Sequence, residues 1–135
     1  MTGDNRRRNV ATEVARGKES LAAARALLPL GLANDALSRA YYGAYHHARA
    51  LLLTVDVEPK THGGLARLLK RHFEDRIGER AVSLFARLQT FRQAADYDAE
   101  AHFEPAEAEA ELRRAEEFVQ SARGVLESGG WLSGA

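Results

Sequence analysis

Hydrophobic residues recur at steps of three and four positions along most of the chain, the spacing of helices that bury one face. Prolines and glycine pairs fall between these periodic segments, where they end helices rather than interrupt them. Alanine, leucine, arginine and glutamate, all good helix formers, dominate the composition. The pattern therefore predicts an all-α fold. The expected helices cover residues 10–28, 34–54, 62–73, 79–97 and 105–126.

The expected organisation is a single domain between two flexible ends. A chain of 135 residues is long enough for one hydrophobic core. Residues 1–9 are expected to form a flexible basic arm, residues 10–127 the helical domain, and residues 128–135 a flexible tail. The short connection after Leu28 predicts that the first two helices form an antiparallel pair.

The segment 34–54 has two distinct faces and is expected to be the central helix. Its apolar stripe consists of Leu37, Ala40, Tyr41, Ala44, Ala48, Leu51 and Leu52. The opposite face carries Asp35, Arg39, Tyr42, His46, Arg49 and Leu53. A plain solvent face would be mostly Glu, Lys and Ala, so this face indicates a binding site or a partner surface. The alternative is a second packing face, with Tyr42 and Leu53 in the core and His46 as a satisfied, half-buried histidine.

Charge and cysteine content exclude several classes of function. Nineteen basic residues balance nineteen acidic ones, so no global field draws the protein to nucleic acid or to an anionic membrane. Basic residues nevertheless predominate over residues 60–92 and acidic ones over residues 98–117, which leaves room for a locally basic surface. The absence of cysteine excludes disulfides and thiolate catalysis. We expect no metal, no cofactor, no membrane partner and a cytoplasmic location.

Arg92 is the first candidate for chemistry outside the central helix. It lies seven residues after Phe85 and four after Leu88, on the buried edge of the 79–97 stripe. Asp96 follows one helical turn later, so the two can form a structural clamp, or the arginine can be held ready to bind phosphate. Gly63 and Gly64 fit an ordinary helix start, capped by Thr61, better than a phosphate cradle.

Three segments together resemble the HEPN domain family, over roughly residues 31–126. They read SRAYYGAYHHARALL, KTHGGLARLL and FRQAADY, at residues 38–52, 60–69 and 91–97. The resemblance implies an up-and-down bundle of four to five antiparallel helices, commonly a homodimer through the helices that carry these motifs. It also implies a partner, because many members are encoded beside a minimal nucleotidyltransferase as toxin and antitoxin.

Other members of this family cleave RNA without a metal, using an arginine followed by a histidine after four to six residues. Arg92 matches that arginine, but residues 97–99 are Tyr, Asp and Ala, and His102 lies beyond the window. Arg39 and His46 have the required spacing on the 34–54 helix instead. If the protein is a ribonuclease, we expect His46 as acid or base, with Arg39 and Arg92 on the phosphate.

The leading hypothesis is a polar cluster that binds nucleotide or RNA phosphate and a minimal nucleotidyltransferase in a toxin–antitoxin module. We expect this cluster to form where the 34–54 and 79–97 helices pack together. The alternatives are a metal-independent endoribonuclease and a structural dimerisation adaptor without a ligand. The expected members of the cluster are Arg39, Tyr42, His46, Arg92, Asp96 and Tyr97.

Overall fold

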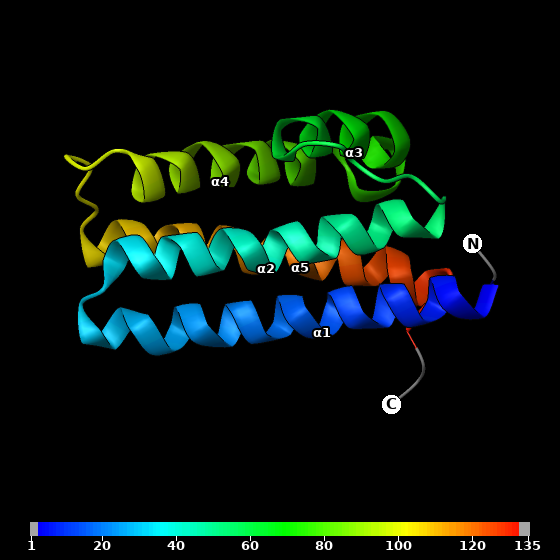
Figure 1. Cartoon of the computed structure of the whole chain (residues 1–135), viewed down its shortest axis with the longest axis horizontal. Coiled ribbons are helices and arrows are strands. Elements are labelled where there is room, and N and C mark those ends of the chain that lie inside the picture. The colour runs from blue at the N-terminus through cyan, green and yellow to red at the C-terminus, as the bar shows by residue number, and fades with distance from the viewer. Residues whose placement is uncertain (1–2, 133–135) are drawn as a thin grey trace.

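The computed structural model describes residues 3–132, and over these residues the chain is an all-α bundle, as predicted. Its elements are α1 (Gly3–Leu27), a 3₁₀ turn η1 (Leu28–Leu30), α2 (Ala33–Thr54), α3 (His62–Ile77), α4 (Glu79–Tyr97) and α5 (Pro105–Ser128). Helices α1, α2, α4 and α5 run lengthwise beside one another, and α3 packs near one end (Figure 1). Within the described part of the chain, no helix has the length and apolar character needed to cross a membrane.

Helix α2 is the centre of the bundle and contacts all four other helices. The seven residues of its predicted apolar stripe are fully buried, which confirms that face as core. Leu53, which the sequence places on the opposite face, is buried as well. For this residue the alternative prediction, a second packing face, is therefore correct. Helices α1 and α2 approach closely at Gly17 and Gly43, where a Cβ atom would meet the facing helix.

The N-terminal arm is the main correction to the predicted boundaries. Helix α1 begins at Gly3 rather than at Val10, so residues 3–9 are helical. The cause is tertiary: Arg7 donates a hydrogen bond to the carbonyl oxygen of Gly130 at 2.8 Å, and its guanidinium lies over the Trp131 ring. Gly130 and Trp131 belong to the segment that was expected to form a flexible tail, and both contact α1 here. Residues 1–2 and 133–135 lie outside the described residues.

The other helix boundaries agree closely with the sequence pattern. Helix α3 starts at its predicted cap, where the Thr61 hydroxyl accepts the Gly64 N–H at 2.9 Å, as in an ordinary helix start. It continues four residues past Phe73 and is followed by Gly78. The φ of Gly78 is 92°, a conformation that glycine adopts without strain. That single residue joins α3 directly to α4, so α3 stays close to the α2–α4 contact.

A buried histidine lies at the contact between α1 and α2. The His47 side chain is fully buried, and its Nδ1 is hydrogen-bonded to the carbonyl oxygen of Gly43 at 2.8 Å. Its Nε2 has no hydrogen-bond partner among the described residues. The pKa of His47 is lowered to about 4, mainly by burial and also by nearby Arg123, His46 and Lys18, while the hydrogen bond to Gly43 opposes this shift. The native protein therefore holds this imidazole neutral.

We predict that His47 makes the fold unstable in acid. The unfolded chain takes up a proton near pH 6.5, whereas the native chain resists it down to about pH 4. Stability is therefore complete above pH 6.5 and declines as the pH falls toward 4, by up to about 3 kcal/mol. Urea unfolding at a series of pH values measures this, beside His47→Asn, whose amide can still donate to Gly43. The variant should show a flatter pH dependence, and equal slopes would exclude His47 as the cause.

Candidate functional site

The candidate site forms where α4 packs against α2, and Arg92 is at its centre. This side chain is only 4% exposed, which confirms its predicted position on the buried edge of α4. Its guanidinium carbon lies 5.0 Å from the centre of the Tyr41 ring, 5.8 Å from Tyr42 and 5.5 Å from Tyr97. Burial works against its charge, but a hydrogen bond to Tyr97 and the neighbouring tyrosines raise the pKa of Arg92. The site thus contains a permanent cation surrounded by aromatic rings.

The polar contacts of Arg92 are long for a buried cation. Its Nη1 donates to Asp96 Oδ2 and to the Tyr97 hydroxyl, both at 3.4 Å, and its Nε has no hydrogen-bond partner within residues 3–132. Asp96 also accepts a hydrogen bond from the Ser38 hydroxyl at 3.3 Å, so its charge is shared. Tyr97 is 77% exposed, so this side of the cluster borders the surface. The described residues therefore leave part of the donor capacity of this guanidinium unused.

Five of the six predicted cluster residues meet here, and the sixth lies at the edge. Arg39 joins the group through its guanidinium, 4.7 Å from the centre of the Tyr42 ring. His46 instead faces α1, where its Nδ1 lies 2.7 Å from Glu13 Oε2. Its ring centre is 6.4 Å from that of Tyr42. His46 is thus a half-buried histidine with a carboxylate partner, as the packing alternative described it.

His62 is the site residue that the sequence hypothesis did not include. As the first residue of α3, it reaches the α2 surface, where its Nδ1 is hydrogen-bonded to the Tyr41 hydroxyl at 3.1 Å. Its ring stacks on Tyr45 with centres 4.8 Å apart. Burial lowers the pKa of His62, and the positive charges of Arg92 and Arg49 lower it further. Burial also raises the pKa of Tyr41, so its hydroxyl keeps its proton at neutral pH.

The three motif segments noted in the sequence meet at this site. Segment 38–52 supplies Tyr41, segment 60–69 supplies His62, and segment 91–97 supplies Arg92. The HEPN domain family model matches residues 13–132, which is nearly the whole described chain. This chain belongs to the HEPN domain family.

Curated HEPN-type relatives are similar over most of their length. Two proteins of Methanocaldococcus jannaschii that are named as candidate toxins are 36% identical over 113 residues and 32% identical over 124 residues. These matches cover 81% and 90% of this chain, and 82% and 84% of the relatives. A UPF0332 protein of Gloeobacter violaceus is 30% identical over 115 residues, which covers 82% of this chain and 90% of the relative.

Proposed function

We propose that this HEPN protein is a toxin-type component that binds the phosphate groups of RNA or of a nucleotide at Arg92. The observation that carries the proposal is a buried guanidinium whose two hydrogen bonds are 3.4 Å long and whose Nε is unpaired in the described structure. Phosphate oxygens offer shorter, charge-assisted bonds to such a group. The names of the two Methanocaldococcus relatives support the assignment to a toxin-type module.

The proposal includes a homodimer and a minimal nucleotidyltransferase as partner, both working in the cytoplasm. The family resemblance supports the partner. Exposed apolar side chains support the dimer: Tyr97 at the end of α4 is 77% exposed and Leu32 before α2 is 45% exposed. Asn34 ties the start of α2 to the loop between α4 and α5, because its amide donates to the Ala101 carbonyl and accepts the Phe103 N–H. A second copy could cover both apolar side chains at once.

We predict that Arg92→Lys weakens the binding of labelled RNA or nucleotide by about tenfold or more. Lysine keeps the charge but loses the planar set of donors that grips phosphate oxygens. Arg25→Lys is the matched control, because Arg25 is paired with Glu116 between α1 and α5. Fluorescence anisotropy measures the affinities, and equal affinity of both variants and the wild type would contradict the proposal.

Thermal unfolding and sedimentation of the same variants test the alternative of a structural adaptor. If the Arg92 cluster only holds the dimer together, Arg92→Lys lowers the melting temperature or yields monomers, and the wild type binds neither RNA nor nucleotide. If the cluster binds phosphate, Arg92→Lys loses affinity while its oligomeric state remains that of the wild type.

A metal-independent endoribonuclease is the second candidate function, and His62 favours it. The family mechanism needs a histidine near the phosphate-binding arginine, and the α4 motif lacks one. The structure places His62 against Tyr41, whose ring is in contact with the Arg92 guanidinium. A neutral imidazole beside a buried cation is suited to take a proton from a ribose 2′-hydroxyl.

A further inference from the structure

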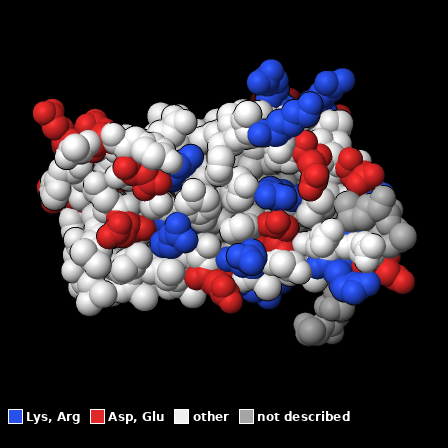
Figure 2. Space-filling view, in the orientation of Figure 1, with Lys and Arg blue, Asp and Glu red and all other residues white. Residues whose placement is uncertain are grey.

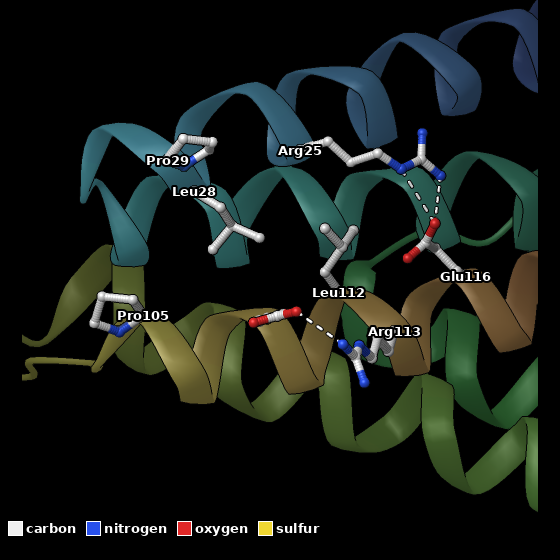
Figure 3. Close-up of a pocket in the computed structure, with 8 residues that line it drawn as sticks. Arg25, Leu28, Pro29, Pro105, Leu112, Arg113 and Glu116 are labelled. Atoms are coloured by element: carbon white, nitrogen blue, oxygen red, sulfur yellow. Dashed lines mark hydrogen bonds and ion pairs between the residues drawn. The ribbon is translucent and has the colours of Figure 1, made fainter.

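The concave surfaces of the described structure differ in how their charges are balanced. The groove between the α1–α2 turn and α5, of about 460 Å³, is lined by Leu28, Pro29 and Leu112 and bordered by arginines (Figure 3). Its arginines are neutralised: Arg25 pairs with Glu116, and Arg113 with Glu109. This groove therefore offers no free cation to an anionic ligand.

The groove along α3 has the opposite character. It has a volume of about 420 Å³, and Lys60, Arg67 and Arg71 lie along it. None of these three forms an ion pair with a carboxylate of residues 3–132, and no Asp or Glu occurs between Glu58 and Glu74. Figure 2 shows basic side chains gathered over α3 on the face in view. The net charge of the protein is zero, so this local excess is not a general property of its surface.

One carboxylate, Glu58, also lines the groove, and its charge is partly neutralised. Its Oε1 lies 3.8 Å from Nη2 of Arg49, a residue that does not line the groove. The groove therefore keeps three cations against one partly neutralised acid. Two apolar residues, Val57 and Leu68, also line the groove.

The groove and the Arg92 site are linked by the start of α3, where Thr61 lines the groove and the next residue, His62, belongs to the site. Lys60 and Thr61, which line the groove, directly precede His62 in the chain. His62 stacks on Tyr45 and is hydrogen-bonded to Tyr41, whose ring contacts Arg92. Three unpaired cations thus lie on α3 or just before it, and the first residue of this helix, His62, contacts the aromatic rings around Arg92. Such a combination is typical of surfaces that bind single-stranded nucleic acid.

We propose that the α3 groove binds the phosphate backbone of a single-stranded RNA that also reaches the Arg92 site. This inference rests on the proposed function and narrows it, because a mononucleotide has too few phosphates to reach both places. Lys60, Arg67 and Arg71 hold the backbone without reading its sequence, as phosphate contacts do. The aromatic cluster then receives an unstacked nucleotide next to Arg92.

The test compares the affinities of full-length variants for a labelled single-stranded RNA of about 12 nucleotides. Arg67→Gln with Arg71→Gln should weaken binding roughly tenfold and reduce the slope of log K against log salt by about 1.4, since two phosphate contacts are lost. The same variant should bind a labelled mononucleotide as the wild type does. Arg16→Gln with Lys18→Gln removes the same charge from exposed positions on α1 and should change neither affinity.

The outcomes separate this inference from the proposed function. If Arg92→Lys weakens RNA binding and the α3 double variant does not, the proposed role of the groove is wrong and the proposed function stands. Equal losses of RNA affinity in the α3 and α1 double variants would also contradict the role of the groove, because the affinity would then depend on net charge alone. If the wild type binds neither RNA nor mononucleotide, the proposed function itself fails.

Discussion

Replacing Gly17 by valine is expected to destabilise the protein by about 3 to 5 kcal/mol. A Cβ atom at this position would lie 2.4 Å from Nδ1 and 2.5 Å from Cε1 of His47, and 3.0 Å from the Gly43 carbonyl oxygen. The imidazole is fully buried, so it has no free space to occupy. Either the hydrogen bond from His47 to Gly43 breaks, or α1 and α2 separate along their contact.

Gly124→Val is the matched control for this substitution. Gly124 is also inside a helix, α5, but a Cβ atom there would meet no heavy atom within 4 Å. Its stability should change by less than about 0.5 kcal/mol, because glycine and valine are both poor helix formers. Urea unfolding of both variants measures the difference. Similar free energies of unfolding would show that the α1–α2 contact tolerates a side chain at Gly17.

The sequence predicts the helices well because their determinants are local. Apolar periodicity, the Thr61 cap and the Gly78 break are read directly from neighbouring residues, and the structure confirms each. The start of α1 could not be predicted in this way. It depends on Arg7 and Trp131, which are more than a hundred residues apart and meet only in the folded bundle.

The candidate site shows the same division between local and tertiary information. Arg92 and Asp96 are one helical turn apart, so their proximity follows from the sequence, and the α2–α4 packing brings Tyr42 to them. The partner of His46 is Glu13 on another helix, which no local spacing indicates. His62 was missed for the same reason, although its place in a recognised motif segment was a signal that could have found it.

If the protein is the ribonuclease proposed above, His62→Ala is expected to reduce RNA cleavage by about 10² to 10⁴-fold, the usual contribution of a general base. In the tautomer that donates from Nδ1 to the Tyr41 hydroxyl oxygen, Nε2 is free to take the proton of a ribose 2′-hydroxyl. In this proposed mechanism the 2′-oxygen bonds to phosphorus, the bond to the 5′-oxygen breaks, water protonates the leaving oxygen, and the imidazole returns its proton to the hydroxide that remains. The charge that develops on the phosphate faces the guanidinium of Arg92. The products are a 2′,3′-cyclic phosphate and a 5′-hydroxyl.

Cleavage in EDTA by the wild type, His62→Ala, His46→Ala and His72→Ala decides between the histidines. His72 is an exposed residue of α3, so its variant controls for the loss of an imidazole from the same helix. Loss in His62→Ala alone assigns the base to His62, whereas loss in His46→Ala alone returns that role to the Arg39–His46 pair. Activity that survives in all variants would mean that neither histidine is the base. Because the pKa of His62 is lowered, the cleavage rate should decline at a lower pH than an ordinary histidine would give. A decline centred in that range would instead point to a histidine with an ordinary pKa.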